Sequence, residues 1–247
     1  MTTSVTAATA AAIIAAARLA LPQRCELCVT RTEGGLLCDA CERSLPRIAW
    51  ACPVCALPSR QSATCGACLA HPPPFTATIA AYAYAFPTDR LLQRVKYGGR
   101  LALAEWAGVA LASAARTAYH TALAGRSARD FPDRIVALPL ATGRQRERGF
   151  NQAREIAIHV ARRTRLPLAA PLSRIAAGPP QTTLKWTQRR RNVRGAFVVT
   201  GAVRGARIAL VDDVMTTGAT LAEASRALVA AGAQRVECWV VARTPPP

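Results

Sequence analysis

The sequence has few acidic residues, few lysines and few aromatic residues. It contains 14 Asp and Glu against 32 Lys and Arg, which gives a net charge of +18 and a pI near 11.0. Lys96 and Lys185 are the only lysines, so arginine carries nearly all of the positive charge. A bias in coding composition toward Arg and Ala would explain part of this excess. The shortage of acids disfavours a cationic partner and favours an anionic one, such as a nucleic acid, a phosphorylated small molecule or a membrane surface.

Long hydrophobic runs are also missing. The longest apolar stretch, residues 7–21, is short for a membrane span, rich in Ala and interrupted by Arg18. A secretory signal carries its positive charge before the apolar region, whereas Arg18 is the first charged residue and lies near the end of the stretch. We therefore expect a packed N-terminal helix, no membrane span and a cytoplasmic protein.

Three segments differ in composition. We expect a helix in residues 1–22, a Cys-, Gly- and Pro-rich module in residues 23–74 and an α/β domain in residues 75–247. In the last segment, apolar runs typical of buried strands alternate with helical patterns, which predicts a parallel sheet with helices on both faces. The expected strands are 80–86, 134–140, 207–211 and 235–242, and the expected helices are 89–97, 102–119, 152–163 and 221–231.

Eight of the nine cysteines form a repeat of C-x-x-C pairs. In each set of four, nine residues separate the first pair from the second, and each cysteine of the second set lies 27 residues after its counterpart. Two such pairs supply four thiolates to one tetrahedral ion, so the spacing predicts two structural zinc sites with no open coordination position. The predicted ligands are Cys25, Cys28, Cys38, Cys41, Cys52, Cys55, Cys65 and Cys68.

Disulfides and an iron–sulfur cluster are the alternatives for these cysteines. A cytosolic location disfavours disulfides, and two regular four-cysteine sets are more typical of zinc than of a cluster. Spacing alone leaves open whether the ligands pair within each repeat or between repeats. The ninth cysteine, Cys238, is expected to be a buried apolar residue.

An apolar strand at residues 207–211 is followed by two carboxylates, a loop of small and hydroxyl residues, and a helix. Backbone N–H groups at a helix start favour an anion, and Gly218 lets the backbone approach it closely. The carboxylates of Asp212 and Asp213 suit sugar hydroxyls instead. The alternative is that these residues only cap the strand and the helix. The predicted ligand residues are Asp212, Asp213, Thr216, Thr217, Gly218, Ala219 and Thr220.

This stretch resembles the signature of type I phosphoribosyltransferases, which bind 5-phosphoribosyl pyrophosphate (PRPP). The resemblance implies a five-stranded parallel core, a flexible hood, and Mg²⁺ held by the pyrophosphate and the ribose hydroxyls. It assigns Asp212 and Asp213 to the ribose and residues 216–220 to the 5-phosphate.

The cysteine module followed by this domain is similar to the ComF/GntX family of competence-associated, phosphoribosyltransferase-like proteins. The matching stretches are residues 92–99, 148–152, 181–184 and 190–197. This resemblance implies a role in DNA uptake, with single-stranded DNA and other competence proteins as partners. One departure is visible, because Ala141-Thr142 stand where the family usually has His-Pro, in a loop expected near the pyrophosphate.

Arginines gather in two places. Lys96, Arg144 and Arg148 are expected at the pyrophosphate, because basic side chains there suit phosphate oxygens. No Asp or Glu occurs between Glu155 and Asp212, and an aromatic residue within this interval lies among basic ones, as in single-strand binding surfaces. Trp186 has an alternative role as a buried hood residue. The predicted nucleic-acid residues are Lys185, Trp186, Arg189, Arg190, Arg191 and Arg194.

Two functions fit these features. The first is a PRPP-binding protein of the ComF type that handles single-stranded DNA, and the second is a phosphoribosyltransferase of nucleotide metabolism that acts on an unidentified base. The sequence supports PRPP binding better than turnover, since no acceptor pocket can be identified from it. Whether the chain is an enzyme stays open at this point.

Overall fold

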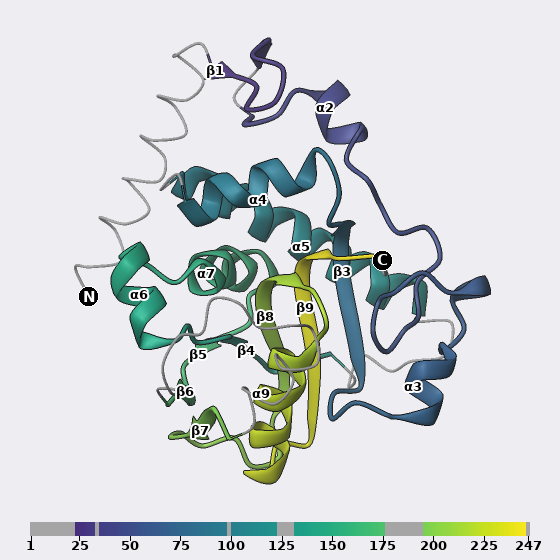
Figure 1. Cartoon of the computed structure of the whole chain (residues 1–247), viewed down its shortest axis with the longest axis vertical. Helices are drawn as coiled ribbons and strands as arrows, with labels where there is room; N and C mark the ends of the chain where they lie inside the picture. Colours follow the sequence, from purple (N-terminus) through teal and green to yellow (C-terminus); the bar gives the residue numbers. More distant parts are fainter. Residues whose placement is uncertain (1–22, 33–34, 98–99, 123–130, 176–194, 246–247) are drawn as a thin grey trace, which may run out of the picture. The chain divides into compact units, whose positions relative to one another are not determined.

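The computed structural model describes residues 23–32, 35–97, 100–122, 131–175 and 195–245 (Figure 1). It forms two compact units, the first ending at Leu45 and the second beginning at Pro46. The expected helix in residues 1–22 lies outside the described residues. The first unit contains an antiparallel pair of short strands, β1 (Gln23–Arg24) and β2 (Arg31–Thr32), and helix α2 (Asp39–Arg43).

A five-stranded parallel sheet forms the centre of the second unit. Its strand order is β3-β9-β8-β4-β5, and every neighbouring pair is parallel. The strands are β3 (Ala77–Ala83), β4 (Arg134–Ala137), β5 (Leu168–Ala169), β8 (Arg207–Met215) and β9 (Arg235–Arg243). This sheet confirms the predicted α/β fold class.

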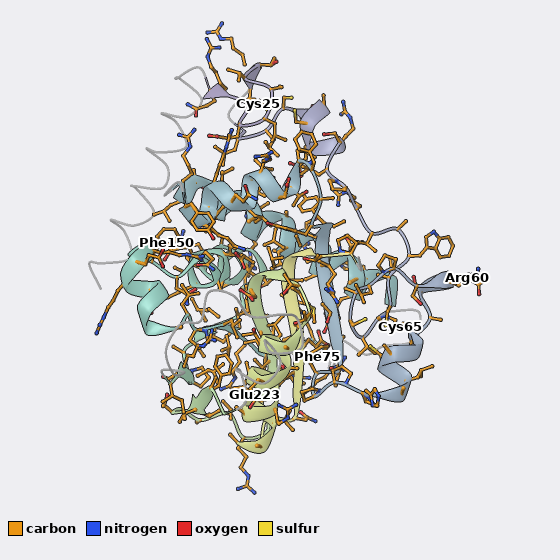
Figure 2. The ribbon with its side chains drawn as sticks, in the orientation of Figure 1. Cys25, Arg60, Cys65, Phe75, Phe150 and Glu223 are labelled. Carbon is orange, nitrogen blue, oxygen red and sulfur yellow. The ribbon has the colours of Figure 1, made fainter. Side chains whose placement is uncertain are left out.

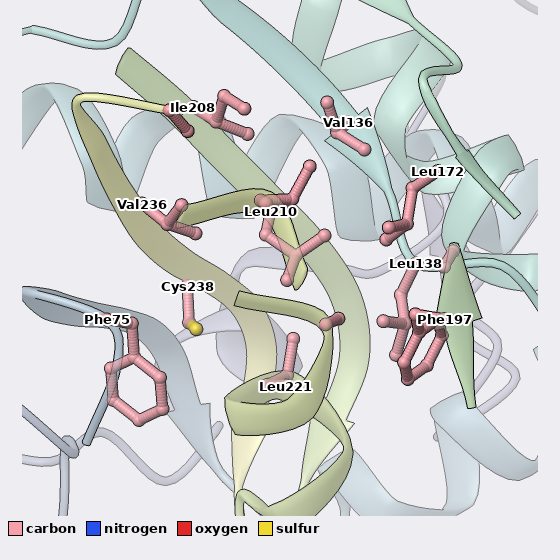
Figure 3. Packing of buried hydrophobic residues seen from close by; sticks show 14 of the residues in the cluster. Phe75, Val136, Leu138, Leu172, Phe197, Ile208, Leu210, Leu221, Val236 and Cys238 are labelled. Carbon is pink, nitrogen blue, oxygen red and sulfur yellow. The ribbon is translucent and has the colours of Figure 1, made fainter. Parts of the chain in front are cut away.

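Helices cover both faces of the sheet. The helices that pack on it are α5 (Leu101–Ala122), α7 (Gln152–Thr164) and α9 (Ala219–Ala230). Two further helices are α4 (Thr88–Tyr97), which packs on α5, and α6 (Thr142–Arg148). On one face, Leu221 of α9 packs with Leu210 and Cys238 (Figure 3). Successive side chains of a strand point to opposite faces. Glu237 therefore points to the other face, where the Tyr119 hydroxyl of α5 donates to its Oε2 at 2.5 Å.

The second cysteine module, residues 46–74 with Cys52, Cys55, Cys65 and Cys68, belongs to the same unit as the sheet. It contains a short 3₁₀ turn, η1 (Arg60–Ser62), and helix α3 (Gly66–Ala70). Thr78 of β3 donates to this module twice, from its backbone N to Pro53 O at 3.1 Å and from Oγ1 to Val54 O at 2.7 Å. The module is thus bonded directly to a strand of the sheet.

Several elements differ from the sequence expectations. Strand β8 continues through the two carboxylates to Met215, because its pairing with β9 extends to Arg243. Strand β4 ends at Ala137, before the end of its apolar run. Strand β5 and the antiparallel pair β6 (Leu172–Arg174) and β7 (Phe197–Val199) were not expected, because two or three residues show no periodicity. None of the helices in the described part of the chain combines the length and apolarity needed to cross a membrane.

Close packing of α5 on α7 requires a glycine. A Cβ atom at Gly108 would lie 2.5 Å from His159 Cβ and 2.8 Å from Ile156 O. These atoms belong to or adjoin the α7 backbone and cannot rotate away. We expect Gly108→Ala to lower the free energy of unfolding by about 1–3 kcal/mol, because overpacking outweighs the gain of about 1 kcal/mol in helix propensity.

Gly143→Ala is the matched control, because a Cβ atom at this helical glycine meets nothing within 4 Å. Urea unfolding monitored by circular dichroism should show it to be neutral or stabilising. Equal stability of the Gly108→Ala protein and the wild type would contradict the packing of α5 on α7.

Candidate functional site

The carboxyl edge of the parallel sheet holds the predicted loop. After β8, the chain passes through Thr216 and Thr217 to Gly218, which has a φ of +77° and precedes the first residue of α9. A side chain at Gly218 would be strained at this φ, and its Cβ would lie 2.7 Å from Met215 Cε. Thr217 Oγ1 accepts from Ala219 N at 3.2 Å. The turn therefore leads directly into the helix N-terminus, where free N–H groups suit an anion.

The two carboxylates lie at the end of β8. Asp213 is buried, with 6% of its side chain exposed, and Lys96 Nζ lies 3.0 Å from its Oδ2. Burial and the neighbouring Asp213 carboxylate raise the pKa of Asp212 well above its ordinary value. Lys96, expected at the pyrophosphate, thus contacts the carboxylate pair from the end of α4. A cation and two carboxylates at this spacing can hold both a sugar hydroxyl and a phosphate oxygen.

A second basic residue lies beside Lys96. The Arg148 guanidinium lies 5.0 Å from the ring centroid of Tyr97, and its NH2 lies 3.4 Å from the Tyr97 hydroxyl oxygen. Because Tyr97 follows Lys96 in the chain, this contact brings the ends of α4 and α6 together. The side chain of Arg144 lies outside the described part of α6. Two of the three residues predicted for the pyrophosphate therefore lie in this neighbourhood.

Asn151 fixes the chain between β4 and α7. Its Oδ1 accepts from Ala153 N at 3.0 Å and Arg154 N at 3.3 Å, and its Nδ2 donates to Leu138 O at 3.1 Å. The side chain caps α7 and binds the chain just after β4. The sequence analysis included residue 151 only as part of the matching stretch 148–152 and predicted no role for it. An Asn directly before a helical pattern is the signal that could have found this cap.

Arg243 was missed by the sequence analysis. It is 4% exposed at the end of β9. Its NH1 donates to Met215 O at 2.9 Å and to Thr244 O at 3.1 Å, and its Nε donates to Cys55 O at 2.8 Å. NH1 also donates to Thr216 O. One buried guanidinium therefore binds the start of the loop and the second cysteine module together. The sequence feature that could have indicated this role is a charged residue at the end of the apolar run of β9.

The eight repeated cysteines form two groups of four, one in each unit. Within each group the four Sγ atoms lie within 4.8 Å of one another. Cys28 Sγ and Cys38 Sγ are 3.6 Å apart, and Cys55 Sγ and Cys65 Sγ are 3.7 Å apart. Tetrahedral zinc with Zn–S bonds of about 2.3 Å separates its sulfurs by about 3.8 Å. Both groups therefore fit zinc, and the ligands pair within each repeat, which the spacing had left open.

Hydrogen bonds to sulfur support thiolate ligands. Leu27 N donates to Cys25 Sγ at 3.4 Å, and Cys65 N donates to Cys52 Sγ at 3.3 Å. Side-chain and backbone hydrogen bonds from Thr30 lower the pKa of Cys28 to about 6. Since zinc binds the thiolate form, these donors favour the state that holds the metal.

The predicted nucleic-acid residues lie outside the described residues. This applies to Lys185, Trp186 and the arginines at 189, 190, 191 and 194, so their role stays a prediction. The stretch 181–184 lies outside them as well.

Comparison with known proteins identifies both parts of the chain. Residues 16–69 match the family described as double zinc ribbon domain, and residues 151–246 match the phosphoribosyl transferase domain. The DNA utilization protein YhgH of Salmonella typhimurium is 32% identical over 233 residues, covering 92% of this chain and 99% of the relative. Competence protein F of Haemophilus influenzae is 30% identical, covering 84% of this chain and 90% of that protein.

A solved structure gives a weaker likeness. The purine phosphoribosyltransferase from Pyrococcus horikoshii Ot3 is 19% identical, covering 57% of this chain and 73% of that chain, at a TM-score of 0.32. The sequence relatives are the stronger finding, because they span nearly the whole chain. The chain shares 32% identity with such a relative over 92% of its own length, and a double zinc ribbon precedes its phosphoribosyl transferase domain. The chain therefore belongs to the ComF/GntX family.

Proposed function

We propose that this protein binds PRPP with Mg²⁺ at the loop between β8 and α9 and handles single-stranded DNA during DNA uptake in natural transformation. The observation that carries the PRPP proposal is the geometry of the loop. A carboxylate pair, a glycine at positive φ and a helix N-terminus follow one another at the carboxyl edge of a parallel sheet. Ligands of open α/β sheets bind at this edge.

Each part of PRPP has a matching group in this site. Backbone N–H groups and hydroxyls of residues 216–220 would hold the 5-phosphate. Asp212 and Asp213 would accept hydrogen bonds from the ribose hydroxyls. Lys96, Arg148 and Arg144 would bind the pyrophosphate, and Mg²⁺ would neutralise its charge between the pyrophosphate and the ribose. Lys96 Nζ lies 3.0 Å from Asp213 Oδ2, so one cation would lie between the ribose and the pyrophosphate.

The DNA part of the proposal rests on charge and on the relatives. The net charge is +18, and the acid-free interval contains the Lys185–Arg194 segment. The relatives described above are named a DNA utilization protein and a competence protein. We place the protein in the cytoplasm, where cysteines bind metal rather than pair, and expect other competence proteins as partners.

A second candidate is an active phosphoribosyltransferase without a DNA role. Its support is Tyr97, a residue that is 74% exposed beside Lys96 and whose ring face opposite Arg148 could receive an acceptor base. In such a reaction the protein would mainly orient ligands and stabilise the charge of the departing pyrophosphate. Pyrophosphate release measured with PRPP, Mg²⁺ and a panel of bases separates this candidate from a binding protein.

Replacing the carboxylate pair tests PRPP binding. The double variant Asp212→Asn/Asp213→Asn should bind PRPP in the presence of Mg²⁺ at least about 10-fold more weakly in calorimetry, because hydrogen bonds to charged groups contribute about 1.5–3 kcal/mol each. Asp133→Asn is the matched control, since this carboxylate lies at the opposite edge of the sheet, where it pairs with Arg134 and Arg207. Wild-type affinity in the double variant would refute the loop assignment.

Metal analysis tests the cysteine groups. The wild type should contain about two zinc ions per chain. Cys28→Ser and Cys55→Ser should each remove about one, because each breaks one group of four. Cys238→Ala should retain both, since this buried cysteine belongs to neither group. Iron in place of zinc, or a wild type without metal, would contradict the zinc proposal.

Salt titration tests the arginine segment. The affinity for single-stranded DNA should fall with salt by about 0.7 log unit per log unit for each phosphate contact. Arg190→Gln/Arg191→Gln should lower this slope by about 1.4. Arg162→Gln/Arg163→Gln removes the same charge from the last turn of α7 and should change the slope less. A wild-type affinity that does not respond to salt would contradict phosphate binding by arginines.

A further inference from the structure

The second unit has a broad, open hollow away from the loop between β8 and α9. Its volume is about 960 Å³, and its walls are residues 47–50, residues 58–61 and Ala83. Most of the wall comes from the second cysteine module. The two module segments are held together by a bridge between Ala51 and Pro58 and by a hydrogen bond from Ser59 N to Trp50 O at 3.0 Å. Backbone hydrogen bonds therefore hold the two segments of the wall next to each other.

Trp50 lies in this hollow with 59% of its surface exposed. Trp is highly buried on average in folded proteins, and an exposed indole gives a flat or apolar group a surface on which to stack. Neighbouring apolar residues such as Ile48 and Pro58 extend this surface. The hollow therefore offers a stacking platform.

The positive charge of the wall favours an anionic ligand. Arg47 and Arg60 are both part of it, and no acidic side chain is among its residues. The Arg47 guanidinium lies 5.2 Å from the ring centroid of Tyr82, which holds the cation in place. Arg60 projects outward from the ribbon on the side that carries Cys65 (Figure 2). The sequence has no Asp or Glu between Glu42 and Asp89, a second acid-free interval.

A wall that combines an exposed indole with two guanidinium groups fits a ligand whose flat rings are joined by anions. We propose that this hollow binds single-stranded nucleic acid, with one base stacked on Trp50 and the adjoining phosphates bound by Arg47 and Arg60. This assignment rests on the proposed function in one respect, since it takes single-stranded DNA to be a partner of the protein. An apolar peptide is the poorer fit because it offers nothing to the two guanidinium groups.

Binding measured by fluorescence anisotropy with the full-length, zinc-loaded protein tests the proposal. The probes are oligothymidylate and oligouridylate of about 15 nucleotides. Trp50→Ala should weaken binding about 10-fold, because base stacking on an aromatic side chain has an effect of this order. Trp50→Phe should stay within about 3-fold of the wild type because it keeps a ring. Arg47→Gln/Arg60→Gln should weaken binding and lower its salt dependence by about 1.4.

Leu69→Ala is the matched control, because Leu69 is an apolar residue of the same module that is 68% exposed and lies outside the hollow. It should bind both probes as the wild type does. The comparison of the two probes shows whether the site prefers DNA or RNA.

Three results would overturn the proposal, and they separate it from the proposed function. If the wild type binds oligothymidylate and Trp50→Ala binds it equally well, the hollow is not the site, while the DNA function stands. If Trp50→Ala weakens binding of an abasic oligomer as strongly, there is no base stacking. If the wild type binds neither probe, both the hollow and the DNA function are wrong.

Discussion

One buried arginine joins the parts on which this structure depends. Arg243 donates to Cys55 in the second cysteine module and to Met215 and Thr216 at the start of the loop between β8 and α9. A buried guanidinium must have its donors satisfied, because removing its partners leaves a charge in a poorly solvated place. Burial accordingly lowers the pKa of Arg243, although the nearby cysteines oppose this effect. The position of the loop is therefore tied to the second thiolate group, and zinc loaded there would stabilise both.

The carboxylate pair illustrates why a ligand site needs compensation. Asp212 and Asp213 lie next to each other in a largely buried strand, where two negative charges repel. Lys96 offsets this repulsion from a different element, at 3.0 Å. The guanidinium of Arg148, which lies over the ring of Tyr97, adds a second positive charge at the same edge of the sheet. The site combines opposite charges that a ligand carrying both hydroxyls and phosphates would separate.

Local patterns explain what the sequence could predict. The parallel sheet follows from apolar strands alternating with helices, and the two metal groups follow from a repeat whose ligands are close in the chain. The loop between β8 and α9 is also one continuous stretch of sequence, so its pattern can be read directly. Contacts between distant residues carry no such pattern, which is why the bonds of Arg243 to Cys55 and of Lys96 to Asp213 were missed. The extension of β8 to Met215 was missed because its partner β9, and not its own composition, sustains the strand.

The pairing of β3 has a consequence for how the chain folds during synthesis. In the described sheet β3 has one strand neighbour, β9, and Ala77 pairs with Glu237 far along the chain. Until β9 leaves the ribosome, β3 is an unpaired edge that can associate with other chains. The second cysteine module precedes β3 and is hydrogen-bonded to Thr78 of that strand. A module that folds early around its metal would thus protect the first strand of the sheet while the rest of the protein is being made.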